Sequence, residues 1–117
     1  MTELTLFGLK NCDSCRKARR WLDDNGVAYR FHDVRDDGLD AARLGLWAER
    51  VDWETLVNRK STTWRGLPEN TRASMDRRSA VATMAEHPTL LKRPVLERDD
   101  LLEIGFSPDR YASLLGG

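Results

Sequence analysis

Cysteine is scarce in this sequence, since the 117 residues contain only Cys12 and Cys15, three positions apart. Small secreted domains that depend on disulfides normally contain more cysteines, spread along the chain. The chain is therefore not a disulfide scaffold. Two neighbouring cysteines in a reducing compartment indicate redox chemistry or half of a metal site.

An excess of charge of one sign is also missing, because 19 basic side chains face 19 acidic ones. Nucleic-acid-binding domains usually carry a strong basic excess, so we expect no direct binding to nucleic acid. No apolar run approaches the ~18 residues of a membrane span, and we expect no membrane association. The first residues lack the basic and apolar stretches of a secretory signal, which predicts a cytoplasmic protein.

Repeats, low-complexity tracts and linker-like segments are absent as well. Hydrophobic residues make up 40% of the chain, and this apolar content with zero net charge argues against disorder. We expect one domain spanning residues 1–117, present as a monomer.

The N-terminal third has the pattern of a strand, a helix and a second strand. Residues 3–8 alternate as a strand does, 13–25 have helical periodicity, and 27–34 again alternate. A unit of this size predicts a βαβ crossover with parallel strands. The apolar stripe of the helix consists of Cys15, Ala18 and Leu22.

The remaining chain predicts a helical block followed by a hairpin and a final helix. The helices are expected from an N-cap at Asp40 and at 53–58, 69–76 and 79–87. The hairpin strands are expected at 94–97 and 101–104, and Ser107-Pro108 is typical of a helix start. The whole pattern predicts an α/β domain with a small mixed sheet.

The segment Cys12-Asp13-Ser14-Cys15 follows the first strand and opens the first helix. A helix N-terminus carries about half a positive charge, which favours a thiolate over a thiol. Lys10 and Arg16 add positive charge nearby, whereas Asp13 opposes the effect and is expected to be exposed. We therefore expect a lowered pKa and a reactive thiolate.

The two cysteines are not expected to be equivalent. Cys12 precedes the first full turn, where its side chain can reach solvent, so it is the predicted nucleophile. Cys15 lies on the apolar stripe and is the predicted resolving thiol. Two alternatives are a purely structural pair and a zinc site. A zinc site would have to use His32 and His87, whose spacing fits no compact zinc pattern, so we predict no metal.

Arginine accounts for 15 of the 19 basic residues. The guanidinium group suits bidentate binding of carboxylates and oxyanions. Arg93 precedes Pro94 at the start of a predicted strand, and Arg59 opens a polar loop. Both are candidate anion ligands, although ordinary surface arginines would have the same pattern.

Several separated blocks of the chain resemble the arsenate reductase-like family, which includes glutaredoxin-coupled arsenate reductases, Spx regulators and YffB-type proteins. The YffB-type branch is the most similar. The resemblance implies a thioredoxin-like (glutaredoxin-like) fold with a helical insertion at about 39–87 and a cis Pro94. It also implies that Cys12 is the nucleophile and that Arg59 and Arg93 bind the oxyanion. The blocks that carry it are Cys-Asp-Ser-Cys-Arg-Lys-Ala-Arg-Arg-Trp-Leu, Phe31-His32-Asp33, Thr62-Thr63-Trp64-Arg65, His87-Pro88, Arg93-Pro94 and Gly-Phe-Ser-Pro.

The chain departs from the reductases at two places. They use a third arginine in the second hairpin strand, which here is Leu101-Leu102-Glu103-Ile104, and their Gly-Thr-Ser after the cysteine is Asp13-Ser14-Cys15 here. Both departures weaken arsenate as a substrate, because one cation is missing and one anion is added.

The prediction that follows is a thiol–disulfide oxidoreductase with glutathione as co-substrate and no tightly bound cofactor. Lys10, Arg16, Arg59, Arg93 and Pro94 would line the anion-binding side of its site. One alternative is a glutaredoxin-coupled arsenate reductase. The other is an Spx-like redox sensor that binds the alpha subunit of RNA polymerase.

Overall fold

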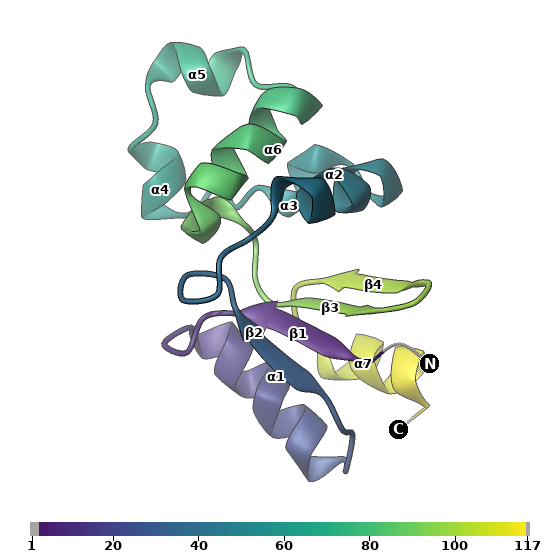
Figure 1. Cartoon of the computed structure of the whole chain (residues 1–117). Coiled ribbons are helices and arrows are strands. Elements are labelled where there is room, and N and C mark those ends of the chain that lie inside the picture. The colour runs from purple at the N-terminus through teal and green to yellow at the C-terminus, as the bar shows by residue number, and fades with distance from the viewer. Residues whose placement is uncertain (1–2, 117) are drawn as a thin grey trace. The chain divides into compact units, whose positions relative to one another are not determined.

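The computed structural model describes residues 3–116, which form two compact units (Figure 1). The first unit takes in the described residues up to Asp33 and from Arg93 onward, and the second is Val34–Lys92. Met1, Thr2 and Gly117, the ends of the expected domain 1–117, lie outside the described residues. The helical segment expected at about 39–87 falls within the second unit.

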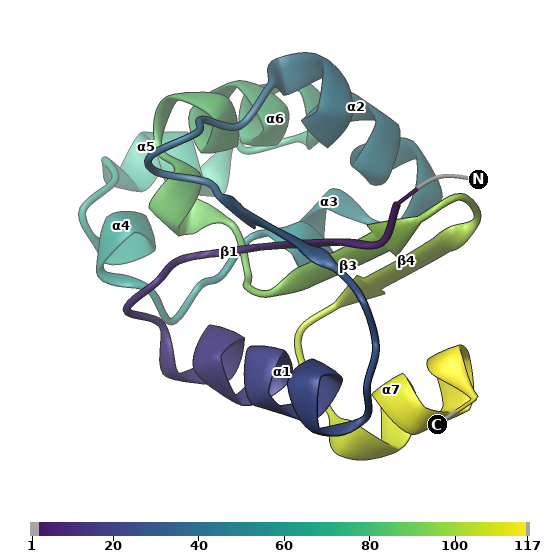
Figure 2. The ribbon, with the colours of Figure 1, turned by 60° about the horizontal axis from the view of Figure 1, so that its bottom comes forward.

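The first unit contains a four-stranded mixed sheet in the order β2-β1-β3-β4. β1 pairs in parallel with β2 and antiparallel with β3, and β3 and β4 form the predicted hairpin (Figures 1 and 2). The mixed sheet and the βαβ crossover are thus confirmed, although β2 is shorter than expected. The strands are Thr5–Gly8, Arg30–Asp33, Val95–Arg98 and Leu101–Ile104.

Two helices, α1 (Asp13–Asp24) and α7 (Pro108–Leu115), lie on one face of this sheet (Figure 2). The expected stripe of α1 is fully buried, and each leucine removed from water in this way contributes about 2 kcal/mol. Ser107 accepts a hydrogen bond from the Arg110 N–H, which confirms the predicted start of α7. The buried core of this face consists of Leu4, Leu6, Ala18, Leu22, Leu96 and Tyr111.

The second unit is helical. Its longest helices are α2 (Ala41–Arg50) and α6 (Arg77–Glu86), which pack against each other. Asp40 caps α2 as predicted, because its carboxylate accepts the Ala42 N–H at 2.9 Å. The shorter elements are α3 (Trp53–Leu56), α4 (Thr62–Arg65), α5 (Glu69–Ala73) and the 3₁₀ turn η1 (Pro88–Leu90).

The helix α4 stands where the sequence predicted a polar loop, so that expectation was wrong. The Ser61 hydroxyl accepts the Trp64 N–H at 3.1 Å and caps this short helix. Four residues are too few to show a helical period, which is why the pattern was missed. Within residues 3–116, no helix combines the length and the apolar character needed to cross a membrane.

Candidate active site

Cys12 is the N-cap residue of α1 and has extended backbone angles, φ −96° and ψ 126°. It follows the short loop that connects the end of β1, at Gly8, to the helix. Its carbonyl accepts the Arg16 N–H at 2.9 Å, and its side chain makes no capping hydrogen bond to the first turn. The thiol is half-buried, as the sequence predicted for a nucleophile that substrate can reach.

The pKa of Cys12 lies below its ordinary value. Partial burial opposes ionisation, but three interactions with the thiolate outweigh it. Cys15, through its backbone N–H and its thiol, and Arg93, through its guanidinium and positive charge, lower the pKa of Cys12. These interactions hold a larger share of Cys12 in the nucleophilic form at neutral pH than an ordinary thiol would have.

Arg93 is a cation that lowers the pKa of Cys12, and the part expected of Lys10 and Arg16 in the site stays a prediction. Both side chains are exposed, where solvent screens their charge. Asp13, expected to oppose the thiolate, is 73% exposed and pairs with Lys17 at 3.2 Å. The carboxylate of Asp13 therefore pairs with a cation on the exposed surface of α1.

Cys15 is fully buried, as predicted from its place on the apolar stripe. Its sulfur accepts the Leu9 N–H at 3.5 Å. Burial, together with the adjacent Cys12, raises the pKa of Cys15 to about 12. At neutral pH this thiol keeps its proton and acts as a hydrogen-bond donor to Cys12. No disulfide joins the two cysteines.

Arg93 and Pro94 begin the β3 side of the site. The peptide bond between them is cis, as the family resemblance implied. Pro94 is buried and its carbonyl accepts the Gly105 N–H at 2.8 Å, which ties this corner to the end of β4. Arg93 is half-buried, and its guanidinium faces the Cys12 sulfur. An anion held by Arg93 would therefore lie next to the nucleophile.

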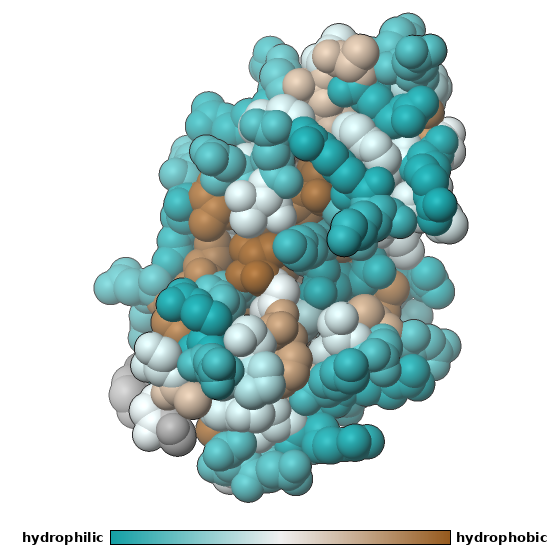
Figure 3. Space-filling model, turned by 180° about the vertical axis from the view of Figure 1, so that it is seen from behind, coloured by the Kyte–Doolittle hydropathy of each residue, from teal (hydrophilic) through white to brown (hydrophobic). Residues whose placement is uncertain are grey.

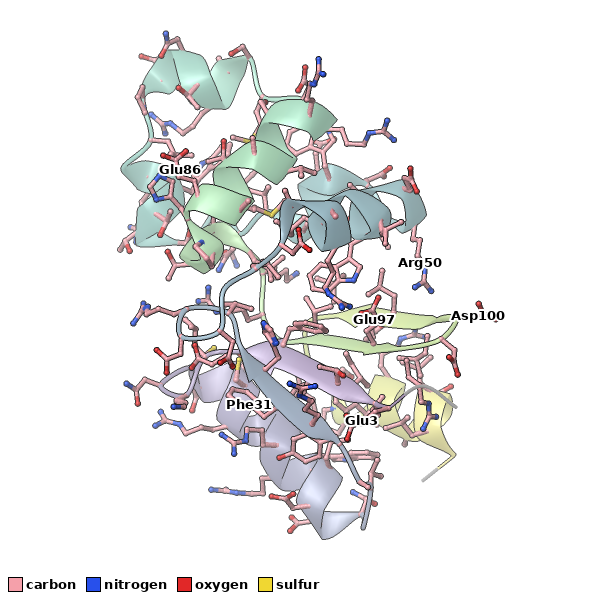
Figure 4. The ribbon with its side chains drawn as sticks, in the orientation of Figure 1. Glu3, Phe31, Arg50, Glu86, Glu97 and Asp100 are labelled. Atoms are coloured by element: carbon pink, nitrogen blue, oxygen red, sulfur yellow. The ribbon has the colours of Figure 1, made fainter. Side chains whose placement is uncertain are left out.

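Asp33 is a site residue that the sequence analysis used only as part of a motif. It ends β2, is 5% exposed, and accepts the Lys10 N–H at 3.4 Å. This contact ties the loop before Cys12 to the sheet. On the same strand, Phe31 (labelled in Figure 4) lies under the Arg19 guanidinium at 4.3 Å. The available signal was an acidic residue near the carboxyl end of the expected strand at 27–34.

Arg59 lies in the second unit, after α3. Its guanidinium is exposed and donates to the Glu54 carboxylate at 2.8 Å, with the Trp64 ring 5.7 Å away. These contacts orient the side chain within its own unit. Its part in binding an anion stays a prediction.

The two histidines have structural positions. The His32 ring packs on Phe7 with a centroid distance of 4.9 Å, and His87 is the C-terminal cap of α6. Among residues 3–116, no three His, Cys, Asp or Glu side chains gather in a group that could hold a metal ion. The chemistry that this site offers is that of a supported thiolate beside an arginine.

Comparison with known proteins decides the family. The model of the ArsC family matches residues 7–114. The chain belongs to the ArsC family. A protein of Haemophilus influenzae is 43% identical to it over 92% of this chain and 95% of its own length. The solved structure of a protein named YFFB is 43% identical, with a TM-score of 0.90 over 94% of this chain and 96% of that one.

The ArsC family also connects the chain to a regulator branch. A global transcriptional regulator Spx from Streptococcus agalactiae is 29% identical over 96% of this chain and 82% of its own length. A glutaredoxin from Archaeoglobus fulgidus shares the fold, with a TM-score of 0.50 at 16% identity. The thioredoxin-like fold and the arsenate reductase-like family expected from the sequence are both confirmed.

Proposed function

We propose that this ArsC-family protein is a cytoplasmic thiol–disulfide oxidoreductase that uses glutathione as its reducing co-substrate. The observation that carries the proposal is the half-buried Cys12 thiol at the start of α1, whose pKa Cys15 and Arg93 lower. Each of them stabilises the thiolate, and the thiolate is the form of cysteine that attacks disulfides.

In the first step, the Cys12 thiolate attacks the glutathione sulfur of a mixed disulfide between glutathione and another thiol. A new sulfur–sulfur bond joins Cys12 to glutathione, and the other thiol leaves as a thiolate that takes a proton from water. The Arg93 guanidinium would hold a carboxylate of the glutathione moiety next to Cys12.

In the second step, the thiolate of a second glutathione attacks the glutathione sulfur bound to Cys12. Oxidised glutathione leaves, and Cys12 returns as a thiolate. The burial of Cys15 and its pKa of about 12 support external glutathione as the resolving thiol. A protonated, fully buried thiol attacks slowly. This part of the proposal departs from the expectation that Cys15 resolves the adduct.

The experiment is a turnover assay with the mixed disulfide of glutathione and 2-mercaptoethanol as substrate, with excess glutathione present. Cys12→Ser is expected to abolish turnover above the uncatalysed rate. Cys15→Ala is expected to retain turnover with a higher apparent Cys12 pKa, and Cys15→Ser, which can still donate a hydrogen bond, is the matched control. Full activity of Cys12→Ser would refute the proposal, and loss of activity in both Cys15→Ala and Cys15→Ser would indicate that Cys15 is the resolving thiol.

Arsenate is the second candidate substrate, with glutaredoxin as the partner that regenerates the enzyme. The stretch Leu101–Ile104 contains no arginine, whereas the resemblance implies one in this strand of the reductases, so a dianion would find one cation fewer here. The acidic residue of this stretch, Glu103, pairs with Arg110 at 3.2 Å. Turnover of arsenate with glutathione and a glutaredoxin, above the blank rate, would favour this candidate.

The third candidate is a redox sensor that binds the alpha subunit of RNA polymerase, in keeping with the Spx relatives. A Cys12–Cys15 disulfide would then be a switch. Capture of the purified alpha subunit that changes with oxidation would support the sensor, and no capture in either redox state would count against it.

A further inference from the structure

A groove of about 460 Å³ runs between α2 and α6, entirely within the second unit. These two helices lie side by side in both ribbon views (Figures 1 and 2). Three features of this groove bear on what could bind there. The groove is lined by Ala42, Gly45, Leu46, Glu49, Arg77, Arg78 and Val81.

The first feature is Gly45 in the interior of α2. Glycine weakens a helix relative to alanine, and it is normally kept where a side chain would clash. A Cβ atom at Gly45 would meet nothing within 4 Å, so the packing of this chain does not require glycine there. The missing side chain instead leaves the wall of the groove open.

The second feature is the next residue, Leu46, whose side chain is 60% exposed. It is the one large hydrophobic side chain that is exposed among residues 3–116. The view in Figure 3 shows a mainly hydrophilic surface with hydrophobic residues in patches. Together with Ala42 and Val81, Leu46 gives the groove an apolar lining.

The third feature is the pair Arg77 and Arg78 in the first turn of α6. Positive side chains are unfavourable there, because the N-terminus of a helix is its positive end. Asp76, the N-cap residue, supplies one negative charge against these two. An anionic partner in the groove would supply the rest.

From these features we propose that the groove is a docking site for an acidic peptide segment that inserts a large apolar side chain. The apolar side chain would fill the space beside Gly45 and contact Leu46 and Val81, and the carboxylates would pair with Arg77 and Arg78. Glu49 at the α2 side repels carboxylates, so the acidic end of the segment lies toward α6. The proposal does not depend on the chemistry of Cys12.

The test is a titration of the isotope-labelled full chain with three synthetic peptides, followed by amide chemical shifts. The probe is acetyl-Asp-Glu-Asp-Leu-Leu-Gln-Gln-amide. Its controls replace both leucines by serine, or all three acidic residues by lysine. Only the probe is expected to bind, with shifts concentrated at the groove residues, and its affinity should fall as NaCl is raised from about 0.05 to about 0.5 M.

Two variants separate docking from folding. Gly45→Ala fills the groove but favours the helix, so it should raise the melting temperature while weakening peptide binding at least about tenfold. The double variant Arg77→Glu/Arg78→Glu also suits the N-terminus of α6 and should lose binding by a similar factor. Arg20→Glu on α1, a charge reversal of the same kind outside the groove, should bind the probe as the unaltered chain does.

Four outcomes would overturn the proposal. One is the absence of binding by the probe, and another is equal binding of the lysine peptide. A third is a set of shifts centred outside the groove. The fourth is concentration-dependent dimerisation in sedimentation velocity that Leu46→Asp abolishes, since the occupant would then be a second copy of the chain. The rate of Cys12 alkylation, measured in the same samples, reports separately on the proposed active site.

Discussion

A Cβ atom on Gly8 would lie 2.5 Å from the Sγ of Cys15, so the sulfur occupies the space that a side chain at position 8 would need. Gly8 is the last residue of β1 and pairs with Asp33 on β2. The close approach brings α1 down onto the carboxyl end of β1. Gly8 therefore leaves room for Cys15, and Cys15 in turn lowers the pKa of Cys12.

The first prediction concerns this contact. Gly8→Ala is expected to lower the free energy of unfolding by about 1–3 kcal/mol, because the first turn of α1 must move to admit the methyl group. It should also raise the pKa of Cys12, because Cys15 would no longer be in place to donate. Urea unfolding and the pH dependence of Cys12 alkylation measure the two effects.

The matched control is Gly45→Ala, the same change at a helical glycine with open space around it. It should raise the free energy of unfolding by about 0.5–1 kcal/mol. If both variants changed stability in the same direction, the Gly8–Cys15 contact would not explain the effect.

The second prediction separates Arg93 from the exposed cations near Cys12. Arg93→Gln removes a hydrogen bond and a charge from the thiolate and should shift the midpoint of Cys12 alkylation to higher pH. Arg16→Gln removes an exposed charge that solvent screens, and should leave the midpoint in place. If Arg16→Gln shifted the alkylation midpoint as far as Arg93→Gln does, the structure would be contradicted. The expectation from the sequence, that the exposed cations near Cys12 lower its pKa, would then be favoured.

The third prediction concerns Tyr111, which is fully buried against Trp21 and Phe106 in edge-on ring contacts. Its hydroxyl finds no hydrogen-bond partner among the described residues. Tyr111→Phe keeps the rings and removes the unsatisfied oxygen, so it should raise the free energy of unfolding by about 1 kcal/mol. Thermal unfolding measures this change. A decrease of similar size in the free energy of unfolding would mean that the Tyr111 hydroxyl makes a stabilising hydrogen bond in solution.

The fourth prediction is a loss of stability at high pH. The pKa of Cys15 is raised to about 12, chiefly by burial, from its ordinary value of 9.0. Above pH 9.0 the unfolded chain releases a proton that the folded chain keeps, so this group lowers stability as pH rises, by up to about 1.4 kcal/mol per unit. Cys12 has the opposite sign: its lowered pKa contributes stability that is complete above pH 9.0 and is lost as pH falls through its folded pKa.

Urea unfolding at about pH 8.5 and about pH 10.5 measures the difference, with Cys15→Ala as the comparison. Because Cys12 titrates differently when Cys15 is replaced, both chains also carry Cys12→Ser, which leaves the other groups to titrate equally. The decline in stability should then be smaller in the chain with Cys15→Ala. An identical decline would show that Cys15 does not keep its proton in the folded chain.

The sequence predicted local features well because their causes are local. The stripe of Cys15, Ala18 and Leu22 repeats at the helical period, and the apolar face of such a helix packs against the core. Ser107 and Asp40 cap helices through contacts with residues two or three positions away. The short helix α4 could not be predicted in this way, because four residues are too few to show a helical periodicity.

The βαβ start, the hairpin, the capped helices and the unequal burial of Cys12 and Cys15 could be read from the order of the amino acids, because each follows from hydrophobic period and capping chemistry. The long-range packing was needed to show that Arg93, 81 residues beyond Cys12, lowers the pKa of Cys12. It also decided that Cys15 fills the space left by Gly8. Both relationships arise from the pairing of β3 with β1 and the packing of α1 on that sheet, which bring together atoms whose distance no local spacing records.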